Sequence, residues 1–303
     1  MLLGGCERPA PDVPAESGSA PVLAPAPNAT PGRDASVTTT WNEDAGPALV
    51  VATDSGRGVV VLPSYTDSTL TDTTTFDLSQ VRGTRLDLFS RPGASGTGAL
   101  LPTATRAAAG AGCTSWPDAA VAPREAPFAR LWTIGFAAGR ARPIPLDPLA
   151  ALAGPDSARL AAEITRVAST VPDDAGSIFR GLPFSVRDAW RLQAAPGTDA
   201  LIAGVLRRIN QEANPRVEHL LLVAERDSGT TGGRFRVAYF ERTNGLEETL
   251  EMSDVLAAVS LGVPPRATIV LARDYGDGAA YSLLERRGAL SWRIRWSSAY
   301  TGC

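Results

Sequence analysis

The chain has 303 residues, 44% of them hydrophobic, and its 29 basic and 32 acidic side chains give a net charge of −3. Every basic residue is arginine and His219 is the single histidine. Schiff bases, Ser–Lys dyads, lysine-containing phosphate loops and multi-histidine metal sites are therefore excluded, and the near-balanced charge argues against a nucleic-acid partner, which needs a clustered basic surface.

The N-terminal segment combines a cysteine with a proline-rich stretch. Leu3-Gly4-Gly5-Cys6 is followed by a run from Glu7 to about Ser36 in which proline recurs seven times. Such a run cannot pack a hydrophobic core, and it is typical of an extended tether. We therefore predict that residues 1–40 are a disordered segment outside the folded part of the protein.

The four residues that end at Cys6 resemble the lipobox of bacterial lipoproteins, in which small residues precede a cysteine that is lipidated. The resemblance implies a lipid anchor at Cys6, export to the cell envelope and attachment to a membrane; Glu7 resembles the pattern of lipoproteins sorted to the outer membrane. A signal peptide needs a positive region and an apolar region of about 7–15 residues. Only Met1–Gly5 precede the cysteine, so either the true start lies upstream or Cys6 matches by coincidence.

Two further cysteines, Cys113 and Cys303, remain once Cys6 carries lipid. An even pair suits an oxidising compartment, and a cysteine at the last position is poorly placed for burial. We expect a Cys113–Cys303 disulfide that ties the final strand to the N-terminal half. The alternative is a pair of free buried thiols in a cytosolic protein.

From Pro47 onward, short apolar runs predict β-strands. ALVVATD and GVVVLPS are separated by the turn signal Asp54-Ser55-Gly56, and GTRLDLF and FARLWTIGFAAG follow as further strands. RPGASGTGALLP interrupts them as a predicted glycine-rich surface loop. No Lys-Ser/Thr follows these glycines, so phosphate binding is not expected there.

One segment has helical spacing. Its apolar residues fall at i, i+4, i+7 and i+11, on one helical face: Leu160, Ile164, Val167 and Val171. Pro155 suits the first turn and Pro172 stops the helix. We predict an α-helix at about 155–171 that packs on β-sheets.

The C-terminal region has the pattern of strands joined by tight turns. PFSVRDAWRLQ and TDALIAGVLRRINQ flank a turn at Ala195-Pro196-Gly197; the second also fits a helix face, and we favour a strand because the turn is short. RVEHLLLVAERD and RFRVAYFERTNG predict a hairpin, while SDVLAAVSLG predicts a short helix ending at Gly262. RATIVLARD, AAYSLLERR and LSWRIRWSS predict three more strands, and the last alternates apolar and polar residues as a half-buried strand does.

These elements predict a mainly β fold of the α+β class, with antiparallel meander sheets and one helix. We expect an N-terminal β region with the helix at 41–172 and a C-terminal antiparallel region at 183–303. A hinge is expected near residues 172–183, with the two halves packed as one unit.

The segment IVLARDYGDGAAYSLLERRGALSWRIRWSS resembles the strand–turn–strand rhythm of VCBS or FG-GAP type repeats in exported proteins. Those repeats usually place an Asp-rich calcium loop before the first strand, where this chain has SLGVPPRAT, without a carboxylate. The resemblance therefore implies export but neither calcium binding by that route nor a closed propeller. Residues 274–278 (DYGDG) could offer oxygens to calcium, but their composition favours a turn.

Few residues stand out as catalytic. His219 lies in EHLLLV, and without a Gly-x-Ser-x-Gly motif it is interpreted as structural. Two carboxylates could perform glycoside hydrolysis, but no pair is distinguished among the candidates Glu163, Asp188, Glu212, Glu218 and Glu225. The tryptophans could line a ligand groove, but their apolar neighbours favour the core: Trp132, Trp190, Trp292 and Trp296.

The leading hypothesis is an exported, lipid-anchored envelope protein, at the outer membrane or facing the periplasm, with a non-catalytic binding or structural role. Its partner would be an unidentified protein or glycan. The alternative is a carboxylate-based hydrolase acting on envelope polysaccharide. No catalytic residue, metal ligand or cofactor is assigned.

Overall fold

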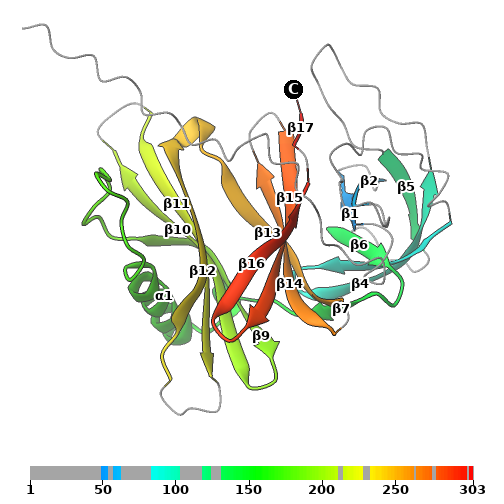
Figure 1. Cartoon of the computed structure of the whole chain (residues 1–303), viewed down its shortest axis with the longest axis horizontal. Coiled ribbons are helices and arrows are strands. Elements are labelled where there is room, and N and C mark those ends of the chain that lie inside the picture. The colour runs from blue at the N-terminus through cyan, green and yellow to red at the C-terminus, as the bar shows by residue number, and fades with distance from the viewer. Residues whose placement is uncertain are drawn as a thin grey trace, which may run out of the picture. The chain divides into compact units, whose positions relative to one another are not determined.

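The computed structural model describes residues 49–53, 57–62, 83–102, 118–123, 131–210, 214–227, 233–262, 264–274, 278–298 and 300–302. These residues belong to one compact unit, Ala35–Cys303. They form a closed six-stranded barrel and two larger antiparallel sheets, with α1 (Gly154–Ala168) as the α-helix of the described ranges (Figure 1). The predicted mainly β architecture with antiparallel sheets and one packed helix is confirmed.

The barrel is built from the first strands of the chain. Its strand order is β1-β2-β5-β4-β3-β6, with these bounds: β1 Leu49–Ala52, β2 Arg57–Leu62, β3 Arg85–Ser90, β4 Gly93–Pro102, β5 Asp118–Pro123 and β6 Ile134–Ala137. One set of buried side chains packs together from these strands and from the segment before β6: Val50, Leu86, Leu88, Leu100, Ala119, Val121 and Trp132.

The expectation of a glycine-rich surface loop at RPGASGTGALLP is wrong, because most of this segment is β4, paired with β3 and β5. Gly98 serves packing. A Cβ on Gly98 would lie 3.0 Å from Val121 Cγ1 and 3.4 Å from Leu88 Cδ1, so the missing side chain lets these two residues fill the barrel.

The second sheet has the order β12-β11-β10-β9-β8. Its strands are β8 Asp147–Pro148, β9 Ser185–Ala195, β10 Thr198–Ile209, β11 Arg216–Asp227 and β12 Arg236–Leu246. Strands β9 to β12 form the predicted meander, with β10 hydrogen-bonded to both neighbours along its length. The choice of a strand over a helix at β10 is therefore confirmed.

The third sheet has the order β16-β15-β14-β13-β7, and β17 pairs with β15. Its strands are β7 Ala141–Ile144, β13 Met252–Leu261, β14 Arg266–Asp274, β15 Gly278–Gly288, β16 Ser291–Ser297 and β17 Thr301–Gly302. Strands β14 to β16 have the rhythm expected of the C-terminal segment. Residues 275–277 lie outside the described ranges, so the interpretation of residues 274–278 as a turn stays a prediction.

The predicted short helix at SDVLAAVSLG is wrong, because these residues form most of β13. Val255 and Ala258 pack toward the second sheet, whereas Ala257 and Val259 pack toward the barrel. The strand is thus buried on both faces and lacks polar alternation. A register shift between Val255 and Ala257 also breaks its two-residue period, so the pattern imitates a helix.

The elements stack in layers, so both faces of each large sheet are covered (Figure 1). Helix α1 packs on one face of the second sheet, where Leu160, Ile164 and Val167 meet strand residues such as Leu220 and Leu222. The other face packs against the third sheet, whose far face contacts the barrel. Because β7 and β8 precede α1 yet pair with β13 and β9, the N-terminal half contributes a strand to each large sheet.

All four singled-out tryptophans are buried, as predicted. They do not share one core, however. Trp292 belongs to the core between the two large sheets, and Trp296 packs toward the barrel. The register of β15 and β16 shifts between Leu283 and Leu284, which inserts Arg295 as an extra residue and turns Trp296 to the opposite face.

Three predictions concern residues outside the described ranges: the tether over residues 1–40, the lipid anchor at Cys6 and the disulfide between Cys113 and Cys303. All three stay predictions. No helix in the described part of the chain is long and apolar enough to cross a membrane.

Candidate functional site

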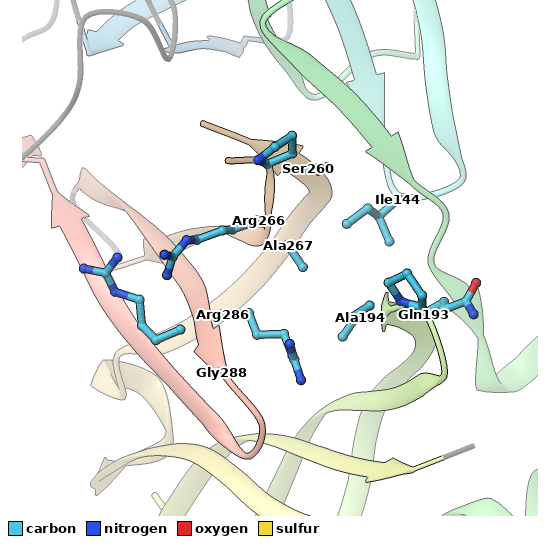
Figure 2. Close-up of a pocket in the computed structure, with 12 residues that line it drawn as sticks. Ile144, Gln193, Ala194, Ser260, Arg266, Ala267, Arg286 and Gly288 are labelled. Atoms are coloured by element: carbon cyan, nitrogen blue, oxygen red, sulfur yellow. The ribbon is translucent and has the colours of Figure 1, made fainter. Parts of the chain in front are cut away.

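A pocket of about 490 Å³ opens at one end of the space between the two large sheets. This volume lies in the range of small-molecule sites, roughly 300–1,000 Å³. The lining comes from β7, β9, β13, β14 and β15 and the turns that follow or precede them. Figure 2 shows Ile144, Gln193 and Ala194 on one side of the pocket and Arg266 and Arg286 on the other.

The pocket combines an apolar floor with cationic walls. Ala194 and Ala267 belong to the buried core between the sheets, and the partly buried Ile144 packs against the same core. Three arginines line the walls, Arg266, Arg286 and Arg287, and the residues that line the pocket include no Asp or Glu. We call this site the arginine pocket.

Arg286 is held by a buried carboxylate. Its Nε and Nη2 donate to the two oxygens of Glu225 at 2.7 and 3.2 Å, and Glu225 is only 2% exposed. Glu225 also accepts hydrogen bonds from the Leu290 amide at 2.8 Å and from Trp292 Nε1 at 2.6 Å. With four donors on one carboxylate, the Arg286 side chain is fixed in place.

Glu285 is the second buried carboxylate near this pocket, and three guanidiniums surround it. Arg287 and Arg295 donate to it at 2.7 and 2.5 Å, and Arg266 lies 3.8 Å away. Glu285 is 1% exposed, so its charge is screened by these side chains and not by water. Near the arginine pocket, therefore, four guanidiniums contact two buried carboxylates.

The opposite end of the same space holds His219. This side chain is 1% exposed, and its Nε2 has no hydrogen-bond partner among the described residues. Burial lowers the pKa of His219 to about 4, and Arg187 contributes to the lowering, against the opposing influence of Glu241 and Asp254. The imidazole is therefore neutral at neutral pH, and the interpretation as a structural histidine fits its surroundings.

Gly204 makes room for the groups beside His219. A Cβ on Gly204 would lie 2.7 Å from Asp188 Oδ1 and 3.2 Å from His219 Nε2, so only glycine lets both side chains reach this point. Asp188 accepts hydrogen bonds from the Gly204 amide at 3.2 Å and from Arg187 at 2.7 Å. Arg187 also donates to Asp254 at 2.5 Å.

Glu241 completes this end. It accepts hydrogen bonds from Arg273, Ser253 and Tyr239 at 2.6–3.2 Å. Burial would raise the pKa of Glu241, but the Arg273 charge and these hydrogen bonds outweigh burial and lower it. We call the group formed by Arg187, Asp188, His219, Glu241, Asp254 and Arg273 the His219 cluster.

The carboxylates proposed for hydrolysis do not face one another. Glu218 and Glu225 lie on opposite faces of β11, seven residues apart, which is about 23 Å along a strand, whereas glycosidase acids lie roughly 5–9.5 Å apart. Glu163 is on α1, paired with Arg166 at 2.7 Å, and Asp188 belongs to the His219 cluster. Glu212 lies outside the described residues.

Glu218 has a structural partner instead. It is bound by Arg207 in a buried ion pair, with Nε at 2.6 Å, on the face of the sheet that carries α1. Arg207 also binds Asp173 at 2.5 Å, which ties the segment after α1 to the sheet. The arrangement stabilises the fold and presents no acid to a substrate.

Sequence reasoning missed the arginines of the pocket. The run Glu285-Arg286-Arg287 was a signal, since adjacent arginines on a strand point to opposite faces and place charge on both.

No cluster of three or more His, Cys, Asp or Glu side chains in the described ranges could hold a metal ion. No protein-family model, curated protein or solved structure matches the chain.

Proposed function

We propose that this protein is a non-catalytic binding protein of the cell envelope, exported and anchored by lipid at Cys6, with the arginine pocket as its ligand site. The observation that carries the binding role is the pocket itself, which joins an apolar floor to fixed arginines. Export and anchoring are supported by the lipobox-like residues and the proline-rich tether.

The geometry supports binding over hydrolysis. The described carboxylates considered as catalytic acids, Glu163, Asp188, Glu218 and Glu225, are each paired with at least one arginine. These carboxylates are engaged in structural ion pairs, and Glu218 and Glu225 lie about 23 Å apart along β11, farther than the two acids of a glycosidase. Hydrolysis of envelope polysaccharide is the rival function.

The binding role is tested by a thermal-shift screen of the full chain with diverse small molecules. The matched variant is Ala195→Trp, which places a large side chain in the arginine pocket. We expect at least one ligand to raise the melting temperature of the parent protein and to lose this effect in the variant. If every hit acts equally on both proteins, the arginine pocket is not the site.

The rival function is tested by incubating the protein with envelope polysaccharide and measuring new reducing ends. We expect none above the rate of a heat-denatured sample. Release of sugar that is lost in Glu225→Gln or Asp188→Asn would establish the hydrolase instead.

The anchor is tested by expressing the gene with its upstream DNA and labelling cells with a palmitate analogue. We expect label on the parent protein and none on Cys6→Ala. An unlabelled parent protein would contradict the anchor and leave the binding role to stand on the pocket alone.

A further inference from the structure

We propose that the outer edge of strand β12 pairs with the same edge of a second copy of this chain, in an antiparallel register centred on Thr243. The contact would join the second sheets of two copies into one continuous sheet about a twofold axis. No residue of β12 lines the arginine pocket, so the failure of this inference would leave the proposed binding function untouched.

Strand β12 is the outermost strand of the second sheet (Figure 1), and among the described strands it pairs only with β11. It has 11 residues, about twice the usual length of a strand, and none of them is proline. A bulge at Ala238 leaves the pairing with β11 regular from Tyr239 to Leu246. The N–H and C=O groups on the outer side of such a strand are a template for a further strand.

The other three edges of the two large sheets are poor templates. Strand β8 has two residues and contains Pro148, and β7 has four residues and contains Pro143. Strand β16 has seven residues, and its register with β15 shifts twice. Short strands, prolines and bulges keep an edge from pairing, and β12 has none of these from Tyr239 onward.

The charged side chains in the regular part of β12 do not protect its edge either. Glu241 is held by Arg273 inside the His219 cluster. Arg242 is only 7% exposed and pairs with Asp174 at 2.9 Å. Charged residues protect an edge by meeting an approaching strand, but these two are already bound within the chain.

Two exposed apolar side chains of β12 indicate the register. Phe240 and Leu246 are 44% and 39% exposed, and their even spacing places both on the face of the sheet that carries α1. They lie six residues or about 20 Å apart along the strand, too far to contact each other within one chain. Thr243 is their midpoint, so a register centred there places Phe240 of each copy opposite Leu246 of the other.

The neighbouring registers are less favourable. A centre on Glu241 or Arg242 places a charge directly opposite its own copy, which is destabilising. A centre on Phe240 runs the pairing through the bulge at Ala238. The register centred on Thr243 stays within the regular part of β12, opposes no like charges and removes both apolar side chains from water.

The test is sedimentation velocity of the full chain at a series of concentrations. A single strand-to-strand contact is small beside a standard interface, so we expect a dimer dissociation constant of about 1–100 μM. Phe240→Lys and Leu246→Glu should each weaken the dimer at least about tenfold, because each places a charge opposite an apolar side chain. The control is Leu101→Lys in β4, which changes a side chain of the same 44% exposure and should leave the dimer intact.

Mixtures of variants test the register. Phe240→Lys mixed with Leu246→Glu should restore a dimer, because the lysine of one chain then faces the glutamate of the other. Phe240→Lys mixed with Phe240→Glu is the matched control. In the register centred on Thr243 these two substitutions do not meet, so this mixture should stay monomeric. Circular dichroism checks that each variant is folded.

The outcomes decide between a second copy and other occupants of this edge. A parent chain that stays monomeric up to about 500 μM overturns the proposal and leaves the edge to a strand from a different protein. A dimer that survives both Phe240→Lys and Leu246→Glu uses another surface and equally overturns it. Rescue by the control mixture alone would overturn the register centred on Thr243 in favour of one centred on Phe240.

Discussion

Charged residues lie at both ends of the space between the large sheets, in the His219 cluster at one end and around the arginine pocket at the other. Glu225 at the arginine pocket and His219 in the His219 cluster lie on the same strand, β11, six residues or about 20 Å apart. Near the pocket, arginines surround the buried Glu225 and Glu285, whereas in the His219 cluster Arg187 and Arg273 pair with Asp188, Asp254 and Glu241 around a neutral histidine.

The two ends differ in how their charged side chains are paired. In the His219 cluster, the charged side chains pair with one another across the sheets, as Arg187 does with Asp254. Near the pocket, Arg286 likewise pairs with Glu225 across the sheets, whereas Glu285 pairs with arginines of its own sheet. At both ends, removing one partner of a buried pair leaves the other charge uncompensated, and that is what destabilises the fold.

The largest expected effect is at Glu225. Glu225→Ala leaves Arg286, the Trp292 indole N–H and the Leu290 amide without their acceptor in a buried site. We expect the free energy of unfolding to fall by about 3–5 kcal/mol, measured by urea denaturation. Glu247→Ala is the control, because its pair with Arg208 is about half exposed and should contribute at most about 1 kcal/mol.

The second effect concerns acid. The pKa of His219 is about 4 in the folded protein and 6.5 ordinarily, so the unfolded chain binds a proton first as pH falls. Stability that is fully present above pH 6.5 is therefore lost between pH 6.5 and 4, by about 3 kcal/mol. The lowered pKa of Glu241 adds a loss in the same direction at still lower pH.

Urea denaturation at a series of pH values checks this effect. His219→Gln removes the titrating group, so between pH 6.5 and 4 its free energy of unfolding should fall less steeply than that of the parent protein. Parallel pH profiles for the two proteins would show that His219 is not the group responsible.

The third effect is steric and tests how tightly the His219 cluster is packed. Gly204→Ala should cost about 1–3 kcal/mol, because its Cβ would lie 2.7 Å from Asp188 Oδ1. Gly245→Ala in β12 is the control, since the nearest atom to its Cβ would be Leu250 Cδ1 at an ordinary 3.7 Å. Equal melting temperatures for the two variants would mean that the cluster can relax around the extra methyl group.

Several elements could be predicted because their signals are local. The helical face of α1 was predicted at about 155–171, and the helix spans Gly154–Ala168. The turn at Ala195-Pro196-Gly197 does connect β9 and β10, and Gly197 has a φ of 72°, which glycine adopts readily. The burial of the four tryptophans also followed from their apolar neighbours.

Other features depended on what packs against them. Strand β13 lacks the alternation of apolar and polar residues that marks a half-buried strand, because the second sheet covers one of its faces and the barrel covers the other. The two faces occupied by Trp292 and Trp296 were set by a bulge that depends on the register with β15. The glycine-rich segment of β4 was predicted as a loop, but it pairs with β3 and β5, and at Gly98 side chains of those strands occupy the space that a Cβ would need.

By itself the sequence determined the chemistry that is possible: arginine as the only basic side chain, one histidine, and strands with one helix. The tertiary structure alone decided which charges meet. Glu225 and Arg286 are 61 residues apart, and Glu285 gathers arginines from two neighbouring strands, β14 and β16, as well as its own. Ionic matching depends on distances of a few ångströms between side chains from different strands, and the pairing of strands sets those distances.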